Sequence, residues 1–390
     1  MLFVMSFQRS LVGVLVVLVI VAGVGGYFAG SSAVPPPRTV TSTAIQTVTT
    51  TAAAATVTVT STITPPPVTV TSTVTPPPRT VTVTVTPTPT PPPIAWPTRP
   101  VTIVVGFGAG GGSDLAARAY APVLQNLTGV PWTVVNMPGG GGAIAEAYIA
   151  EQPADGYTVL LYGAYAVGNI ILGKNKYKME DYIPICRFQW DVGGLWVRAD
   201  DTRFKTIQDF INYAKEREVT VGGTGLGQIP DHLNTALLAK YTGARLRYIP
   251  YESASEMRTD LLGGKIDAMM EEPGIIVPLI REGRVKALVF FVDKRLSDFP
   301  DVPVATELRL NITYGLWRGL AVRAGVSGDI VKKLEWLCEQ AYSSPYYKEQ
   351  EQKQYLYYRP GLLVGDAFRE FVRSEYTTYL QVFKEIGLIS

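Results

Sequence analysis

The sequence predicts an α/β protein with two lobes, preceded by an apolar N-terminal segment and a Thr/Pro-rich linker. Three observations support this architecture. The 390 residues exceed what one typical core requires. The composition changes from nearly charge-free to ordinary globular at about Trp96. From there strand-like and helix-like apolar patterns alternate, and the same alternation starts again at Thr206.

The first element is an uncharged apolar run from Leu11 to Phe28. About 20 apolar residues cross a bilayer, so this run predicts a transmembrane anchor over 11–29. Arg9 precedes the run, which places residues 1–10 in the cytoplasm as a short head and the remaining chain outside. A cleaved signal peptide is the alternative, although its apolar region is usually shorter. No cysteine closely follows the run, which argues against lipoprotein anchoring.

The second element, residues 30–95, predicts a disordered Thr/Pro-rich stalk. Proline triplets begin at Pro35, Pro65 and Pro76, each followed by Thr-Val alternation. Proline triplets favour extended polyproline II, and Thr/Pro richness is typical of O-glycosylated stalks. The Thr-Val alternation alone is compatible with strands. The prolines and the lack of large apolar side chains argue against a packed sheet.

The remaining chain predicts the two lobes. The strand-like segments VTIVVGF, WTVVNM and YTVLLYG alternate with the helix-like segments SDLAARAYAPVLQNL and GAIAEAYIAE. The alternation resumes with VTVGGTG, LRYIPY and KIDAMM as its strand-like segments. Such an order is typical of a mainly parallel sheet that helices cover on both faces.

Charge and rare residues exclude several classes of function. The net charge of +2 gives no indication of a nucleic-acid partner, which needs a concentrated basic face. Cys186 and Cys338 lack metal-ligand spacing; a disulfide between them stays open, because spacing alone does not show proximity. His232 is the single histidine, which nearly excludes a His-based metal site. We expect no metal, no cofactor and no catalytic residue.

Three glycine-rich turns between a strand and a helix are candidate binding loops: residues 108–114, 138–142 and 222–227. Glycine lets backbone N–H groups come close to a ligand, and the following helix presents unpaired N–H groups and a positive dipole end. In open α/β sheets such turns lie at the carboxyl ends of strands, where ligands bind. Together they predict a nest for a carboxylate or phosphate without any arginine. For a single turn, a tight connection without a ligand is the alternative.

A dinucleotide motif overlaps the first turn. Gly106, Gly108 and Gly111 satisfy G-x-G-x-x-G directly after a strand. A dinucleotide site needs an acidic residue at the end of the next strand, whereas this strand ends in Asn136. No Gly-Lys-Ser/Thr follows, which excludes a P-loop. The motif alone is therefore weak evidence for a nucleotide.

Several longer motifs occur in a fixed order over about three-quarters of the chain. They are WPTRPVTI at 96–103, GAGGGSDLAAR at 108–118, NMPGGGG at 136–142, PADGYT at 153–158, GTG at 223–225 with HL at 232–233, IPY at 249–251, LGGKID at 262–267 and FPDVP at 299–303. In this order they resemble the substrate-binding receptors of tripartite tricarboxylate transporters, the TctC or Bug family. Two positions depart from the family pattern: Gly106 replaces the usual proline, and Thr306-Glu307-Leu308 only loosely follows Thr-x-x-Glu.

The resemblance implies a two-lobed periplasmic-binding-protein fold of type II, which closes on its ligand like a flytrap. Lobe one is expected at 96–199 and 316–390, and lobe two at 200–315. The implied function is capture of a small carboxylate (a di- or tricarboxylate, an acidic amino acid or an aromatic acid) for the permease subunits of a tripartite tricarboxylate transporter. A receptor that reports ligand to a membrane sensor is the alternative. A hydrolase would need an activated nucleophile, and none is evident.

The resemblance also implies a binding site between the lobes. Its lobe-one candidates are Phe107, Ala109, Gly110, Gly111, Gly112, Ser113, Gly139, Gly140, Gly141 and Gly142. Its lobe-two candidates are Thr224, Gly225, His232, Tyr251 and Glu271. For His232 and Tyr251, structural roles are equally compatible with the pattern, and Glu271 is expected at the solvated rim. Asp114 is expected to cap its helix and pair with Arg118 at i+4 rather than bind ligand.

Overall fold

The structure is a computed structural model of the chain. It describes residues 94–225 and 230–390 in full, and upstream of them the backbone of four strands. Residues 1–90 and 91–390 form two separate compact units. In the first unit β1 (Val14–Ile20) pairs antiparallel with β2 (Thr43–Thr49), and β3 (Val57–Thr60) pairs antiparallel with β4 (Thr80–Val83).

The N-terminal unit differs from the sequence prediction wherever it is described. The predicted anchor over 11–29 contains strand β1 in place of a helix, because its β-branched valines and isoleucine also favour extended backbone. The Thr-Val alternation of the predicted stalk forms the paired strands β3 and β4, in contrast to the expectation of a chain without a sheet. The other residues of 11–29 and of 30–93 lie outside the described residues. No described helix combines the length and the apolar character that crossing a membrane requires.

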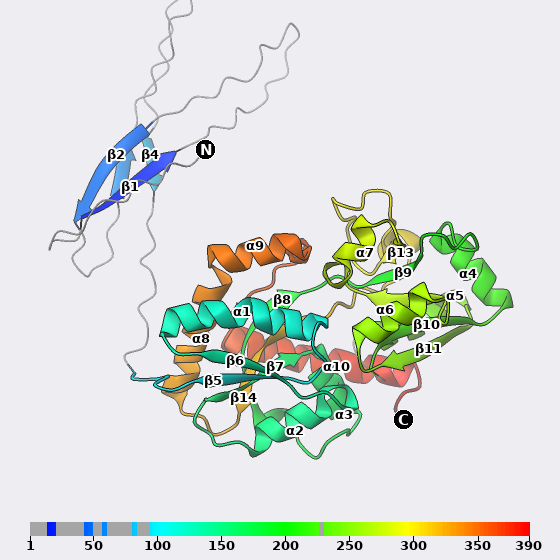
Figure 1. Cartoon of the computed structure of the whole chain (residues 1–390), viewed down its shortest axis with the longest axis horizontal. Coiled ribbons are helices and arrows are strands. Elements are labelled where there is room, and N and C mark those ends of the chain that lie inside the picture. Colours follow the sequence, from blue (N-terminus) through cyan, green and yellow to red (C-terminus); the bar gives the residue numbers. More distant parts are fainter. Residues whose placement is uncertain (1–13, 21–42, 50–56, 61–79, 84–93, 226–229) are drawn as a thin grey trace, which may run out of the picture. The chain divides into compact units, whose positions relative to one another are not determined.

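The C-terminal unit contains two sheets (Figure 1). The first has the strand order β15-β8-β14-β7-β5-β6. Its strands are β5 (Val101–Val105), β6 (Trp132–Asn136), β7 (Thr158–Gly163), β8 (Tyr182–Trp190), β14 (Trp317–Arg323) and β15 (Leu363–Val364). The second has the order β11-β10-β12-β9-β13. Its strands are β9 (Gly194–Arg198), β10 (Val219–Thr224), β11 (Leu246–Tyr251), β12 (Ala268–Glu271) and β13 (Val285–Phe290).

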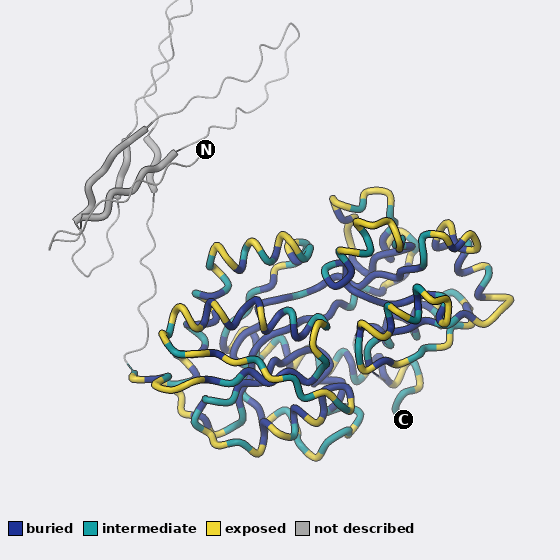
Figure 2. The backbone as a smooth tube through the Cα atoms, viewed as in Figure 1, coloured by how far each residue is buried: buried dark blue, intermediate teal, exposed yellow. Residues whose placement is uncertain are grey.

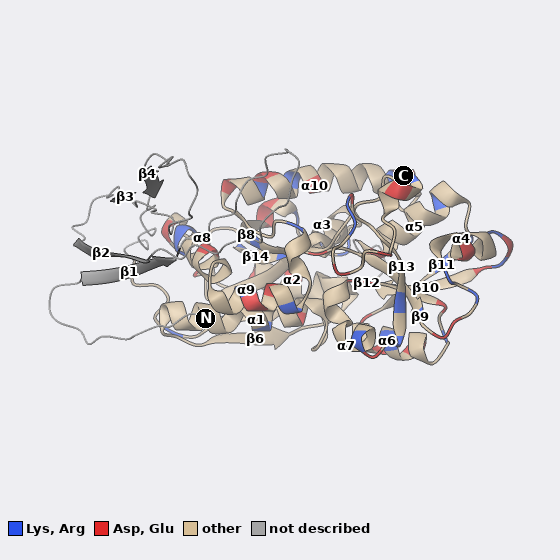
Figure 3. Cartoon of the chain, turned by 90° about the horizontal axis from the view of Figure 1, so that it is seen from above, with Lys and Arg blue, Asp and Glu red and all other residues tan. Residues whose placement is uncertain are grey.

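Helices cover both faces of the six-stranded sheet. On one face lie α1 (Gly112–Thr128) and α8 (Gly328–Tyr342), with α9 (Pro345–Lys353) beside α1. On the other face lie α2 (Ala143–Glu151), α3 (Ala164–Ile171) and α10 (Asp366–Glu385). Both basic and acidic residues occur along α8, α9 and α10, so neither sign dominates these helices (Figure 3).

The five-stranded sheet is covered in the same way. The apolar side chains of α4 (Ile207–Glu216) and α5 (Asp231–Thr242) belong to one core cluster. The apolar side chains of α6 (Ala254–Leu262) belong to a second core cluster. Apolar side chains of the short helix α7 (Val277–Arg281) pack against that cluster. Figure 2 shows the strands buried between these layers. Met269 and Met270 of β12 are fully buried, as expected of a strand that is covered on both faces.

The chain crosses between the two sheets twice. The first crossing, residues 191–193, separates β8 from β9, and the second, residues 313–316, leads into β14. The two crossings touch, since the Asp191 N–H donates to the Leu316 carbonyl at 2.8 Å. Strand β9 thus belongs to the five-stranded sheet, whereas the sequence analysis placed it in lobe one with a boundary at 199. We call residues 94–190 and 317–390 the six-stranded half, and residues 194–312 the five-stranded half.

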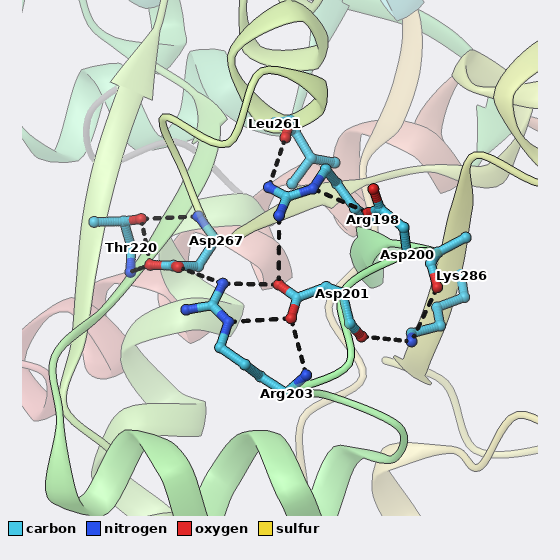
Figure 4. Close-up of polar contacts among 9 residues, drawn as sticks. Arg198, Asp200, Asp201, Arg203, Thr220, Leu261, Asp267 and Lys286 are labelled. Atoms are coloured by element: carbon cyan, nitrogen blue, oxygen red, sulfur yellow. Dashed lines mark hydrogen bonds and ion pairs between the residues drawn. The ribbon is translucent and has the colours of Figure 1, made fainter.

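An ion-pair network stiffens the five-stranded half (Figure 4). Arg203 Nη2 lies 2.7 Å from Asp201 Oδ2 and 2.8 Å from Asp267 Oδ1. The hydrogen bond from Arg203 is the main cause that lowers the pKa of Asp201. Asp267 Oδ2 also accepts from the N–H and hydroxyl of Thr220, at 2.9 and 2.8 Å. Thr220 lies near the start of β10, and Thr224 is the last residue of that strand. The network therefore supports the fold at the end of β10 that lies opposite Thr224.

A disulfide joins Cys186 of β8 to Cys338 of α8. Both residues are fully buried in the core between that helix and the sheet. The structure therefore resolves the alternative that the sequence left open. A structural disulfide of this kind is typical of proteins outside the reducing cytosol.

Candidate functional site

The first glycine loop connects β5 to α1 and is fixed by Asp114. The Gly110 N–H donates to Asp114 Oδ2 at 2.9 Å, and both Arg118 Nε and Asn136 Nδ2 donate to Oδ1 at 2.9 Å. Burial alone would raise the pKa of Asp114, but these hydrogen bonds outweigh it and lower the pKa. The expected i+4 pairing of Asp114 with Arg118 is confirmed. The expected capping of the helix is wrong, because the N-cap is Gly111 without a side-chain cap hydrogen bond, and Asp114 instead fixes the loop through the Gly110 N–H.

The start of α1 presents free backbone donors. Within the described residues no hydrogen bond uses the N–H of Gly112 or of Ser113, as is usual for the first turn of a helix. Gly112 has no room for a side chain, because an added Cβ would overlap the Arg318 guanidinium and lie 2.8 Å from Ile275 Cδ1. Arg318 Nε donates to Ser113 Oγ at 3.3 Å. The missing side chain at Gly112 thus brings an arginine against the positive end of a helix.

Arg318 of β14 is 3% exposed and is held by one acid from the first crossing and one from the five-stranded half. Its Nη1 pairs with Asp191 Oδ2, and its Nη2 lies 3.6 Å from Glu272 Oε2. Burial disfavours the charged guanidinium, but Asp191 and Glu272 outweigh this and raise the pKa of Arg318. Burial raises the pKa of Asp191 to about 7, although Arg318 opposes that shift. The sequence analysis expected a carboxylate nest without any arginine, whereas Arg318 lines a cavity between the two halves.

A small cavity lies at this point between the two halves. From the six-stranded half it is lined, beside Arg318, by Phe107, Gly108, Gly111, Gly112, Ser113 and Tyr165. From the five-stranded half it is lined by Thr224, Glu252, Ser253, Ala254, Glu271 and Glu272. Its volume of about 30 Å³ suits a water molecule rather than an organic acid. Side chains or halves must therefore move apart before a ligand of several heavy atoms fits.

The structure divides the sequence-predicted site residues into two groups. Those that line the cavity are Phe107, Gly111, Gly112, Ser113, Thr224 and Glu271. Those that do not line it are Ala109, Gly110, Gly139, Gly140, Gly141, Gly142, Gly225, His232 and Tyr251. Gly108 of the predicted loop 108–114 lines it too, although it was not among the candidate residues. The other lining residues that sequence reasoning missed are Tyr165, Glu252, Ser253, Ala254, Glu272, Leu316 and Arg318. A usable signal was present for Arg318, which interrupts the apolar run LWRGLAV.

The second glycine loop packs against the first loop and does not line the cavity. Gly139 to Gly142 all have positive φ, between 61° and 135°, which glycine adopts at little cost. An added Cβ on Gly106 would lie 2.7 Å from Gly142 Cα, so the two loops touch through backbone. Asn169 Nδ2 donates to the Gly141 carbonyl at 2.9 Å and to Glu146 Oε1 at 2.8 Å. Burial raises the pKa of Glu146 to about 7.

Two residues that the sequence analysis assigned to ligand, His232 and Tyr251, have structural partners near the third turn. The His232 ring stacks on Tyr248 at 4.4 Å between centroids, and the Tyr248 hydroxyl donates to the Gly225 carbonyl at 2.7 Å. Burial lowers the pKa of His232 to about 4, so its ring is neutral at pH 7. Tyr251 is buried and donates to Asp260 Oδ2 at 3.0 Å. Residues 226–229 of this turn lie outside the described residues.

Glu271 ends β12 inside the cavity wall. It is 4% exposed, so the expectation of a solvated rim position is wrong. Its Oε1 accepts from the Glu272 N–H at 3.2 Å. Burial raises its pKa, and the nearby charges of Glu272 and Asp231 raise it further. A strand that is apolar up to its last residue placed this carboxyl at the carboxyl edge of the sheet, where ligands of α/β proteins bind.

Two motifs of the sequence pattern serve the fold instead of the cavity. Trp96 Nε1 donates to the Asp155 carbonyl at 3.1 Å, and Arg99 Nη2 lies 2.9 Å from Asp155 Oδ2. Gly156 has positive φ, and a Cβ there would meet the Trp96 ring at 3.2 Å. These contacts fasten the start of the six-stranded half to the loop before β7.

Comparison with known proteins identifies the family. The family model described as tripartite tricarboxylate transporter family receptor, TctC, matches residues 116–358. Protein BugT of Bordetella pertussis is 31% identical over 299 residues, which cover 75% of this chain and 90% of that protein. The chain belongs to the TctC receptor family.

Solved structures of TctC-type proteins show the same fold. A TctC solute-binding protein from Polaromonas is 30% identical with a TM-score of 0.58, covering 75% of this chain and all of that one. MatC from Rhodopseudomonas palustris, solved with bound malate, is 25% identical with a TM-score of 0.66, covering 74% of this chain and 99% of that one. The expected two-lobed solute-binding fold of this TctC receptor is thus confirmed, and its globular unit is that of an extracytoplasmic solute receptor.

Proposed function

We propose that this TctC receptor captures a small carboxylate between its two halves and delivers it to the permease subunits of a tripartite tricarboxylate transporter. One observation carries the proposal: free N–H groups at the start of α1 and the buried guanidinium of Arg318 meet across Gly112 on one cavity wall. Donors and positive charge on one wall suit a carboxylate. The bound malate of MatC supports this ligand class.

The donors on this wall other than Arg318 supply part of the affinity that a receptor needs. A hydrogen bond to a charged group contributes about 1.5–3 kcal/mol, and a helix N-terminus about 0.3–1 kcal/mol. Two amides, the Ser113 hydroxyl and the helix end therefore supply roughly 5–10 kcal/mol before association costs are subtracted. Micromolar binding corresponds to about −8 kcal/mol after those costs, so these donors fall short by themselves and a further charge-assisted bond from Arg318 is needed.

The two halves are proposed to close on the ligand by rotating about the paired crossings at residues 191–193 and 313–316. The lobe boundaries of the sequence analysis, at 199–200 and 315–316, would place this hinge near Ala199 and Leu316. Leu316 lies in a crossing, whereas Ala199 follows β9 and bonds to the Arg284 carbonyl inside the five-stranded half. X-ray scattering with saturating ligand should show a smaller radius of gyration than without it. An unchanged radius at saturation would count against closure.

Calorimetry of the full chain tests the ligand class directly. We expect saturable binding of at least one compound from a panel of malate, succinate, citrate, aspartate, glutamate and benzoate. An Asp267→Asn variant is the matched control, because Asp267 is a partly buried acid of the five-stranded half that takes no part in the cavity. The control should bind like the parent. If none of the six compounds binds at millimolar concentration, the proposed function fails.

Delivery and anchoring are tested separately from binding. Vesicles that contain the permease subunits should take up labelled ligand only when the receptor is added. Uptake that is independent of the receptor would favour the alternative, a receptor that signals to a membrane partner. Retention of the chain at the membrane through residues 11–29 stays a prediction, and membrane pellets washed with carbonate should keep the protein.

A further inference from the structure

The two walls of the cavity differ in their hydrogen-bonding character. The wall from the six-stranded half offers donors: the first N–H groups of α1, the Ser113 hydroxyl and Arg318. The opposite wall offers acceptors. The Thr224 hydroxyl donates its proton to Asp231 Oδ2 at 3.0 Å, which leaves only oxygen lone pairs toward the cavity. Glu271 and Glu272 add carboxyl groups on the same side.

Glu271 leaves one carboxyl oxygen unsatisfied. Its Oε1 accepts from the Glu272 N–H, but Oε2 is fully buried and has no hydrogen-bond partner within the described residues. Arg258 and Arg318 are the cations whose charge acts on Glu271, and no ion pair within 4 Å joins it to either one there. A buried acceptor without a partner loses about 1–3 kcal/mol of hydration, and more when charged. A ligand donor at this position would recover that loss.

Carboxyl groups outnumber basic groups on the cavity wall. Arg318 is the only base among the described residues that line the cavity, and three acids line it with Arg318: Glu252, Glu271 and Glu272. Arg318 is already engaged by Glu272 and by Asp191 behind it. A ligand with negative charge alone would be attracted by one wall and repelled by the other. A ligand with both charges would satisfy both walls.

Resting on the proposed function, we propose that the ligand is an amino-carboxylate whose carboxylate lies against the start of α1 and whose protonated amine donates to Glu271 Oε2. The amine supplies the cation that the acidic wall lacks and the donor that Oε2 lacks. Glu272 and the Thr224 hydroxyl oxygen are the further acceptors for the other N–H bonds of the amine. Recognition of the carboxylate and of the amine thus falls to different halves, so only such a ligand joins both.

Matched pairs of ligands that differ by the amine alone test this proposal. The pairs are aspartate with succinate, glutamate with glutarate, and 4-aminobutyrate with butyrate, each titrated calorimetrically into the full chain. We expect at least one amine-bearing member to bind at least tenfold more tightly than its partner. Glu271→Gln should reduce that ratio to less than threefold, because a neutral amide keeps the shape but loses the charge. Thermal unfolding establishes that the variant is folded.

Glu252→Gln is the control, since Glu252 lines the same wall but is solvent-exposed. For this variant, the logarithm of the affinity ratio between the amine-bearing and the amine-free member should stay at half of the parent value or more. If the amine-free members bind as tightly or more tightly, the amine subsite is refuted while the proposed capture of carboxylates stands. The amine subsite is refuted in the same way if Glu271→Gln keeps the full preference for the amine. If no member of any pair binds and the wider carboxylate panel also fails, the proposed function itself fails.

Discussion

Replacement of Gly112 by alanine tests whether the approach of Arg318 to α1 matters for binding. At an unstrained position near a helix start, Gly→Ala stabilises a protein by about 0.4–1 kcal/mol. Here the new Cβ overlaps the Arg318 guanidinium and lies 2.8 Å from Ile275 Cδ1. Overpacking of this kind costs about 1–3 kcal/mol, so the free energy of unfolding should fall by roughly 1–2 kcal/mol.

The effect of Gly112→Ala on affinity should be larger than its effect on stability. A displaced Arg318 forfeits about one charge-assisted hydrogen bond to the ligand, or about 1.5–3 kcal/mol. This corresponds to a dissociation constant that is roughly tenfold to 150-fold larger. Calorimetry with the tightest-binding carboxylate measures the dissociation constant, and urea denaturation measures the stability.

Gly108→Ala is the matched control for this experiment. Gly108 also lines the cavity, but nothing lies within 4 Å of an added Cβ and its φ is not positive. Its stability should change by less than about 0.5 kcal/mol, and its affinity by less than threefold. If Gly112→Ala also binds within threefold of the parent, the contact between Arg318 and α1 does not serve the ligand.

Further expectations concern the disulfide, a buried acid and the hinge. Reduction of Cys186–Cys338 should lower the free energy of unfolding by about 2–5 kcal/mol, measured by denaturation with and without reductant; no change would contradict a structural disulfide. Because burial raises the pKa of Glu146 from 4.5 to about 7, the folded protein keeps a proton that the unfolded chain releases, and stability should fall as pH rises through this range. In Glu146→Gln the decrease in the free energy of unfolding between pH 4 and 8 should be smaller by on the order of 3 kcal/mol. An unaltered pH profile would show that Glu146 is not the cause of the decrease. The Cβ of Gly315→Ala would overlap the Asp191 carbonyl, so this variant should be less stable by about 1–3 kcal/mol. It should also alter the change in scattering on ligand binding. A variant with neither effect would argue against contact between the two crossings.

The fold of the globular unit was predictable because its signals are local. Strand-like runs such as that of β7 alternate with amphipathic helices, and this order alone implies covered sheets. The boundary at 199 was placed too late, because the sequence of β9 does not distinguish it from the strands of the six-stranded sheet. Its assignment depends on pairing with β12 and β13, which are distant in sequence. The N-terminal run was ambiguous, since valine-rich apolar sequence suits both a membrane helix and a strand.

The candidate site was predictable in its first loop and, in the five-stranded half, at Thr224 and Glu271. The start of α1 follows from a glycine-rich turn before an amphipathic helix, and it does line the cavity. The second loop has the same composition, but its contacts with Gly106 and Asn169 turn it into a support. Arg318 was missed because its role comes from a neighbouring glycine about two hundred residues earlier in the chain. Motif spacing carries no information about such a long-range contact.

The most direct test of the central claim is the position of a bound carboxylate in a crystal structure of the full chain. The account predicts carboxylate oxygens at about 2.7–3.2 Å from the backbone nitrogens of Gly112 and Ser113, within reach of Arg318. A carboxylate held instead by residues 139–142, with the start of α1 and Arg318 unengaged, would contradict it.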